Sequence, residues 1–354
     1  MKVVGREEQL RGGLTVKNHV NVIVIVILVA LLAPAAAFGA GQTEAAEADS
    51  FELRLAVAPA PPHIWVQTAE YFKEAVEDRT DGRVQISIYH SGVLGNDSEV
   101  VDEIRIGSID LTIAGSTPVM SYYQPMEILG VPYLFTERAH FERAVAADSP
   151  LIEHLKNSID DADVGLKLLG ITGGGLRNLS NRVGPVESIE DIQGMKVRVP
   201  PAPIQSRVWS RFGALPNVLP WGETYTGLQS GVVDAVESTM SGYNSAKLYE
   251  VAPYLALTGH QYMFSSIIMS QRAFDRLPQD IQQIVVQAAD EASELLLELG
   301  FQADEELIDV FVAQGVTVTE VDTSDFIRLM EPFQDETAQQ LRAGEILQIV
   351  RALR

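Results

Sequence analysis

The sequence predicts an α/β fold of two lobes that enclose a hinged cleft. Three observations support this prediction. Strand and helix patterns alternate from residue 51, the alternation returns after residue 164, and one helical pattern is too long for a single small domain. The chain has 354 residues, 46% of them hydrophobic, which is enough for two domains around a sizeable core.

The first unit follows the order β-α-β-α-β. Pro59 ends the first strand, and a Thr-Asp-Gly turn at residues 80–82 closes the first helix. The expected strands are residues 51–58, 84–88 and 109–114, and the expected helices begin near residues 65 and 100. This order predicts a parallel sheet with helices on both faces.

The second unit resumes the same alternation. Its expected strands are residues 164–171, 195–199, 232–236 and 262–270, and its expected short helices are residues 204–212 and 223–230. Ligands of open α/β sheets bind at the carboxyl ends of strands, so we expect a site where loops of both lobes meet.

Residues 279–313 contain no proline and a single glycine, Gly300, while their apolar residues keep helical spacing. This pattern predicts a helix of roughly 50 Å that crosses both lobes. Lobe I is predicted to comprise residues 51–173 and about 262–303, and lobe II residues 174–261 and about 304–354. We expect hinges near residues 173–175, near His260 and within the long helix.

The N-terminus has the pattern of a secretory signal over residues 1–40. Four basic residues precede an apolar run at residues 22–33, and small residues follow, with cleavage expected after Ala37 or Gly39. The alternative is a retained membrane anchor, since residues 22–41 could just span about 30 Å. Residues 41–50 are expected to form a polar tether. The signal predicts export to the periplasm.

Charge and cysteine content exclude several classes of function. The chain has 26 basic and 48 acidic residues, a net charge of −22, and removal of residues 1–40 would make it −24. Such acidity argues against nucleic acid and anionic membranes as partners. The sequence has no cysteine, which excludes disulfides, thiolate metal sites and a lipid anchor on cysteine.

Two arginines at strand ends are candidates for anion binding. Arg177 follows the triple glycine at residues 173–175, and Arg198 lies in the strand at residues 195–199. A guanidinium is a planar fork of donors that matches a carboxylate, so the two side chains could clamp one ligand. The alternative is that each pairs with one of the many surface acids.

Aromatic and histidine side chains offer further candidates. Trp221 lies between Pro220 and Gly222, where a ring can form the wall of a ligand cleft or plug a loop onto the core. Trp209 and Tyr225 flank it in the sequence. His63 precedes the first helix and could cap it or donate to a ligand; the cap is the preferred interpretation.

The sequence lacks the familiar catalytic motifs. There is no nucleophile elbow, phosphate-binding loop, zinc-protease motif or dinucleotide fingerprint, and the six histidines are too dispersed to suggest a metal pair. The sequence therefore predicts a protein that is not an enzyme and has no cofactor or metal.

Two long segments carry a family resemblance. They read GLRNLSNRVGPVESIEDIQGMKVRVP and FGALPNVLPWGETYTGLQSGVVDAVE, and GVPYLF lies upstream. From about Leu53 to about Phe333 the chain resembles the DctP family, the substrate-binding proteins of tripartite ATP-independent periplasmic (TRAP) transporters. The resemblance implies a two-lobed, periplasmic-binding-protein-like fold braced by a long helix. It also implies a monomer that closes on a small carboxylate and delivers it to the membrane subunits of a permease.

The resemblance also implies roles for individual residues. Arg198 matches the arginine that pairs with the ligand carboxylate, Arg177 an arginine that adds contacts, and Trp221 an aromatic that packs on the ligand. Tyr225 belongs to the helix that follows. Many members carry an asparagine after the Val-Asp-x-x-Glu motif, whereas here Glu237 is followed by Ser238.

Two other functions and several ligands remain open on the sequence alone. A secreted organic-acid enzyme on the same scaffold lacks an evident nucleophile or base, and a membrane-anchored ligand sensor would need the signal to be retained. Dicarboxylates, sugar acids such as uronates, and 2-oxo or hydroxy acids are all compatible with a carboxylate clamp.

Overall fold

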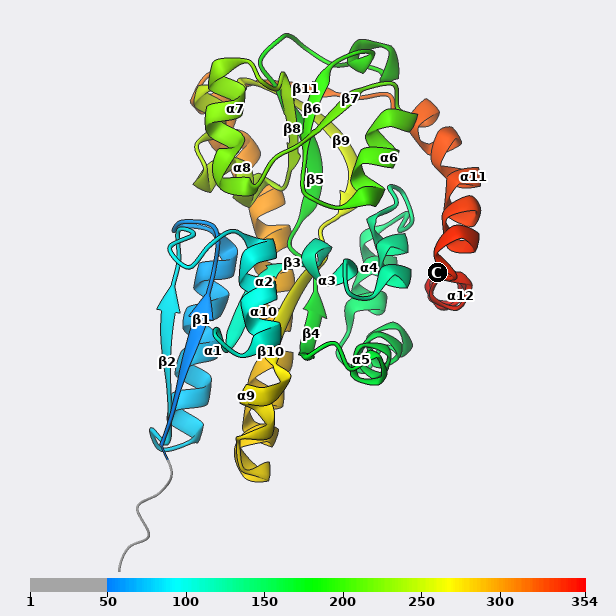
Figure 1. The fold of residues 1–354 in the computed structure, drawn as a ribbon. Helices are drawn as coiled ribbons and strands as arrows, with labels where there is room; N and C mark the ends of the chain where they lie inside the picture. Colours follow the sequence, from blue (N-terminus) through cyan, green and yellow to red (C-terminus); the bar gives the residue numbers. More distant parts are fainter. Residues whose placement is uncertain (1–49) are drawn as a thin grey trace, which may run out of the picture. The chain divides into compact units, whose positions relative to one another are not determined.

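The structure is a computed structural model that describes residues 50–354. The predicted signal and residues 41–49 of the predicted tether lie outside this range. Two β-sheets organise the described residues, one with the strand order β2-β1-β3-β10-β4 and the other with the order β11-β9-β5-β8-β6-β7 (Figure 1). Of the strands expected in the second unit, residues 195–199 and 232–236 lie in the second sheet, whereas residues 164–171 and 262–270 correspond to β4 and β10 of the first sheet.

The first sheet is mixed, not wholly parallel as predicted. β1 runs parallel to β2 and β3, whereas β10 runs antiparallel to β3 and β4, because β10 enters this sheet from the other one. The strands are β1 (Phe51–Ala56), β2 (Val84–Tyr89), β3 (Leu111–Gly115), β4 (Leu166–Thr172) and β10 (Ser265–Ser270). The helices that follow β1, β2 and β10 are α1 (Ile64–Arg79), α2 (Asp97–Ile106) and α9 (Gln271–Asp275).

The second sheet contains four strands that the sequence did not predict, namely β5, β7, β9 and β11. Its strands are β5 (Leu176–Asn181), β6 (Lys196–Val199), β7 (Leu215–Val218), β8 (Ala235–Ser238), β9 (Tyr254–Tyr262) and β11 (Thr317–Glu320). Its helices are α6 (Pro203–Arg211), α7 (Thr224–Ser230) and α8 (Met240–Ser245), with short 3-10 turns η2 (Ile189–Ile192), η3 (Trp221–Glu223) and η4 (Leu248–Glu250). β5 was missed because polar and apolar residues are buried alike along it, which removes the alternation.

The chain passes between the sheets through two adjacent linkers, residues 173–175 and residues 263–264, which together are called the crossing. β4 leads into β5 through residues 173–175, β9 leads into β10, and Met263 N donates to Gly175 O at 2.9 Å. The predicted long helix is confirmed as α10 (Gln279–Ala313), which packs on α1 and β4 beside the first sheet and on α8 and β11 beside the second (Figure 1). A Cβ at Gly300 would lie 2.5 Å from Gly175 N, so only glycine lets the helix pass this close to the crossing.

The C-terminal helices contact the first sheet's side of the molecule. α11 (Ser324–Leu341) contacts η1 (Gln124–Gly130) and packs Phe326 edge to face on Phe212 at the end of α6, while α12 (Gly344–Ala352) contacts α5 (Pro150–Ala162), which packs on β4. The division into lobes at these residues stays a prediction. The apolar face of α12, formed by Ile346, Leu347 and Val350, is buried there. The other helices of this region are α3 (Thr117–Met120) and α4 (Arg138–Val145).

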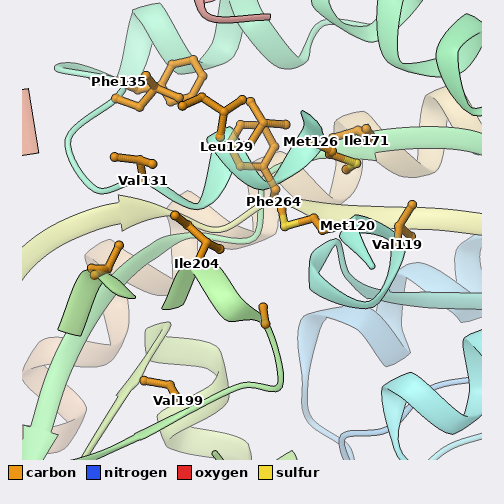
Figure 2. Close-up of a cluster of buried hydrophobic side chains, with 14 of the residues drawn as sticks. Val119, Met120, Met126, Leu129, Val131, Phe135, Ile171, Val199, Ile204 and Phe264 are labelled. Carbon is orange, nitrogen blue, oxygen red and sulfur yellow. The ribbon is translucent and has the colours of Figure 1, made fainter. Parts of the chain in front are cut away.

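A buried apolar cluster joins the two sides of the molecule. Figure 2 shows Val199 and Ile204, from β6 and α6, in the same cluster as Leu129 of η1, Ile171 of β4 and Phe264 of the crossing. Burial of this shared surface holds the two sheets together in the conformation described here. No helix within residues 50–354 has both the length and the apolar content that crossing a membrane requires.

Candidate functional site

A cavity lies between the two sheets and is lined by both. The first sheet contributes the segments after β1 and β3, and the second contributes the ends of β6 and β8, so the cavity has the strand-end position expected of an α/β ligand site. It has an empty volume of about 550 Å³. Its lining residues are Pro59, His63, Trp65, Asp97, Gly115, Thr117, Arg177, Arg198, Pro200, Trp221, Ser238, Thr239, Gly242 and Met263.

Arg198 is buried in this cavity without an acidic partner. On β6 the neighbouring Val197 and Val199 are fully buried in the core, and Arg198, alternating with them, is directed to the cavity with 3% of its surface exposed. Its Nε donates to Leu219 O at 2.9 Å, and its Cζ lies 5.4 Å from the Trp221 ring centroid. Across residues 50–354, neither Nη atom has a hydrogen-bond partner, and no carboxylate forms a salt bridge with this arginine.

Burial lowers the pKa of Arg198 to about 10, although the carboxylates of Glu237 and Asp97 oppose this change. The guanidinium therefore stays protonated at neutral pH. A buried cation without an ion-pair partner is costly, and an anionic ligand in the cavity would supply that partner.

Arg177 has a partner of its own, which distinguishes it from Arg198. β5 and β8 pair antiparallel, and across them Arg177 Nε donates to Glu237 Oε2 while Arg177 Nη2 donates to Glu237 O at 3.1 Å. The Arg177 Nη1 atom contacts Met263 Sδ at 2.7 Å. The charge of Arg177 is therefore balanced within the protein, and its side chain is held at the cavity wall.

Glu237 lies behind the cavity wall and is not one of the lining residues. Burial alone would raise the pKa of Glu237, but Arg177 and His260 outweigh it and hold the pKa at about 2. His260 Nε2 lies 3.6 Å from Glu237 Oε2, and His260 Nδ1 lies 2.9 Å from Thr258 Oγ1. The structure thus brings Glu237 to the site as the residue that positions Arg177.

His63 and Trp221 both line the cavity. His63 Nδ1 accepts a hydrogen bond from Trp65 N at 3.1 Å at the start of α1, so the predicted helix cap is confirmed. Burial lowers the pKa of His63 to about 3, and the ring is neutral at physiological pH. Trp221 and Trp65 add apolar surface to the wall.

Tyr225 does not reach the cavity. It lies on the partly exposed side of α7, where its hydroxyl donates to Glu250 Oε2 at 2.8 Å. Trp209 is also outside the cavity and is 1% exposed in the core, packed edge to face on Phe212. Trp209 and Tyr225 are close to Trp221 in the sequence, but neither ring reaches the cavity. α6 places Trp209 in the core, and α7 places Tyr225 beside Glu250.

Sequence reasoning missed several lining residues, of which Asp97 is the only acid. Asp97 is the first residue of α2, and the adjacent Asn-x-x-Glu capping box marks that helix start in the sequence. Nothing in the local sequence indicates that the helix begins at the cavity. Over the described range, no group of three or more His, Asp or Glu side chains could hold a metal ion.

Comparison with known proteins gives the same family throughout. The family profile described as bacterial extracellular solute-binding protein, family 7 (DctP), matches residues 55–341. The 2,3-diketo-L-gulonate-binding periplasmic protein YiaO of Escherichia coli K12 is 31% identical over 259 residues, which are 73% of this chain and 78% of YiaO.

Two solved TRAP periplasmic solute-binding proteins, each 25% identical in sequence, share the fold. The protein of Polaromonas sp. JS666, bound to D-erythronate, has a TM-score of 0.81 and covers 86% of this chain and 99% of its own. The protein of Chromohalobacter salexigens DSM 3043, with bound D-glucuronate, has a TM-score of 0.80 and covers 85% and 100%. The chain therefore belongs to the DctP family, the periplasmic, non-enzymatic solute-binding proteins of TRAP transporters.

Proposed function

We propose that this protein is exported to the periplasm, captures a small hydroxylated organic acid through Arg198, and delivers it to the membrane subunits of a TRAP permease. The observation that supports this proposal is the buried Arg198 guanidinium, which faces the cavity without an acidic partner in residues 50–354. A ligand carboxylate would satisfy both its charge and its free donors in a site shielded from water.

The other lining residues have complementary roles in this proposal. Arg177, held by Glu237, offers its remaining donor capacity to the same carboxylate. Trp221 packs on the carbon skeleton, and the hydroxyls of Ser238 and Thr239 bond to polar groups of the ligand. Ser238 replaces an amide found in many members, and its hydroxyl is shorter with one donor, so we expect it to alter the preferred ligand.

Sugar acids are a ligand class that several of the compared proteins share. The compared proteins bind 2,3-diketo-L-gulonate, D-erythronate and D-glucuronate, each a hydroxylated acid. A sugar acid presents one carboxylate for Arg198, hydroxyls for the polar lining, and C–H faces for the tryptophans. This distribution matches a cavity with charged, hydroxyl and aromatic residues.

Delivery would depend on closure of the two lobes around the ligand. The linker at residues 173–175 and helix α10 connect the two lobes and must bend during closure. The cavity lies between these lobes. A ligand favours the closed state only to the extent that it binds that state more tightly. We propose that a closed monomer is the form that the permease recognises.

The proposal is tested by thermal-shift measurements on the purified protein with sugar acids, dicarboxylates and neutral sugars. A ligand at a hundred times its dissociation constant adds about 2.7 kcal/mol of stability, which raises the melting temperature measurably. We expect shifts with acids and none with the neutral sugars. The absence of a shift with every acid, or an equal shift with neutral sugars, would overturn the proposal.

Replacement of Arg198 by alanine tests the residue that carries the proposal. We expect Arg198→Ala to keep a cooperative melting transition but to lose ligand affinity by on the order of a hundredfold, because the charged anchor is gone. Arg182→Ala is the matched control, since Arg182 is exposed and lies outside the cavity. Calorimetric affinity within a few-fold of wild type for Arg198→Ala would exclude the anchor role.

A further inference from the structure

Asp97 is an acidic residue that lines a cavity in which we expect an organic acid to bind. Its side chain lines the cavity together with Arg198, and the two attract each other electrostatically without forming a salt bridge. Within the part of the chain that the structure describes, the Asp97 carboxylate has no hydrogen-bond partner. A carboxylate without a hydrogen-bond partner and a guanidinium without an acidic partner therefore face the same cavity.

The hydrogen bonds that cap α2 do not involve the Asp97 side chain, although an acid in the first turn of a helix is favoured by the helix dipole. The N-terminal amides of α2 are capped by the neighbouring residues: Asn96 Oδ1 accepts from Ser98 N at 3.1 Å and from Glu99 N at 3.2 Å, and Glu99 Oε2 accepts from Asn96 N at 2.9 Å. The helix start is thus capped without Asp97, whose carboxylate remains available to a ligand.

The charges around the cavity balance before a ligand enters. Arg177 and Glu237 neutralise each other as an ion pair, which leaves Arg198 and Asp97 as one positive and one negative group at pH 7, where Asp97 is mostly ionised although burial raises its pKa to about 6. The remaining titratable lining residue, His63, is neutral because burial lowers its pKa to about 3. A ligand carboxylate on Arg198 leaves the cavity with one net negative charge, and a second carboxylate near Asp97 would raise it to two without adding a cationic partner.

We propose that Asp97 is a specificity-determining residue that accepts a hydrogen bond from a ligand hydroxyl and rejects a second carboxylate. An ionised carboxylate can only accept hydrogen bonds, so it selects a donor at the far end of a ligand whose acid group is held by Arg198. The cavity is therefore selective for hydroxylated monocarboxylates over dicarboxylates of the same length. This inference rests on the proposed function and narrows its ligand class.

A simpler role for Asp97 makes a different prediction. If Asp97 only balances the charge of Arg198, its neutralisation would change the affinity for every acid in the same direction and by a similar factor. If Asp97 discriminates among ligands, its neutralisation would weaken binding of hydroxylated monocarboxylates and strengthen binding of dicarboxylates. The ratio of the two affinities separates these roles.

The test uses calorimetry with two matched pairs of ligands. D-erythronate and meso-tartrate share an open four-carbon chain, and D-gluconate and D-glucarate share an open six-carbon chain; in each pair the second member has an additional carboxylate. We expect wild-type protein to prefer the monocarboxylate of at least one pair, and Asp97→Asn to reduce that preference by on the order of tenfold or more.

Controls separate this inference from the proposed function. Asp102→Asn makes the same change on an exposed residue of α2 outside the cavity, and should leave the ratio at its wild-type value. Asp97→Ser, which also removes the charge, gives a second measurement if the asparagine variant does not fold. An unchanged ratio in the folded Asp97 variants overturns the role of Asp97, while failure of wild-type protein to bind any organic acid overturns the proposed function and this inference with it.

Discussion

At the scale of single residues, the two cavity arginines differ in what surrounds them. Arg177 forms an ion pair with Glu237, which is fully buried, whereas Arg198 has no acidic partner among residues 50–354. The first arrangement fixes a side chain in place, and the second leaves a charge for an incoming ligand. In the proposed function, Arg177 is held in place by its ion pair, and Arg198 is the arginine that binds the ligand.

Glu237→Gln tests the positioning role. We expect the free energy of unfolding to fall by about 3 kcal/mol, because Arg177 would be left as an uncompensated buried charge. Urea unfolding measures this change, and Glu305→Gln, which breaks an exposed ion pair with Arg138, should cost less than about 1 kcal/mol. A loss no larger than that of the control would contradict the assignment.

The pKa of Glu237 adds a pH dependence to the same comparison. Because its folded-state pKa is about 2 and the ordinary pKa of a glutamate is 4.5, the ionised group stabilises the fold above about pH 4.5. This contribution is lost as the pH falls from 4.5 towards 2. The glutamine variant lacks it, so the difference in stability between wild type and variant should shrink across that range.

At the scale of elements, α10 is the longest connection between the two sides of the molecule. α10 packs closely on the linker at residues 173–175, and this contact requires glycine at position 300. A Cβ there would lie 2.5 Å from Gly175 N and 2.8 Å from Gly174 C. Both are backbone atoms that cannot rotate away. The helix and the crossing are thus packed backbone against backbone at the point where the lobes join.

Gly300→Ala should therefore destabilise the protein, although alanine favours an isolated helix by about 1 kcal/mol over glycine. We expect a lower melting temperature and a loss of at least about 1 kcal/mol, because the helix or the crossing must shift. Gly344→Ala in α12 is the control, since nothing lies within 4 Å of a Cβ at that position. Equal or higher stability of Gly300→Ala would show that the contact can relax without cost.

At the scale of the whole molecule, a titratable group lies where α10 meets the crossing. Asp304 Oδ2 accepts from Leu176 N at 2.6 Å, and Asp304 Oδ1 has no partner in the described structure. Burial raises the pKa of Asp304 to about 7, while the bond from Leu176 opposes the change. The folded protein thus holds a proton here that the unfolded chain releases at a lower pH.

The sign of the resulting pH effect follows from that proton. Between about pH 4 and pH 7 the folded state binds more protons than the unfolded state, so stability should fall as the pH rises through this range. Asp304→Asn keeps an acceptor for Leu176 and should reduce the difference in melting temperature between pH 5 and pH 8. Asp309→Asn, on an exposed part of α10, should leave that difference unchanged; an equal effect of both variants would refute the assignment.

Elements with a strong local pattern were predictable. The spacing in residues 279–313 identified α10 along its full length, and alternation identified β1, β2 and β6. β5 and β9 were not found, because buried polar residues such as Asn178, Asn181 and Thr258 interrupt their apolar patterns. Their oxygen atoms have hydrogen-bond partners: Gly259 N donates to Asn178 Oδ1 at 2.9 Å, Val183 N donates to Asn181 Oδ1 at 2.8 Å, and Thr258 Oγ1 lies 2.9 Å from His260 Nδ1.

Local sequence patterns were sufficient to predict the alternating α/β organisation, the long helix, the family and the presence of arginines at strand ends, because each depends on residues close together in the chain. The contacts at the site required the folded structure, which shows that Glu237 neutralises Arg177, that Asp97 shares a cavity with Arg198, and that Tyr225 bonds to Glu250 outside it. Arg177 and Glu237 are 60 residues apart, and Asp97 and Arg198 lie still further apart in the chain. Which side chains meet across such distances is set by how helices and sheets pack, and packing is a property of the whole fold.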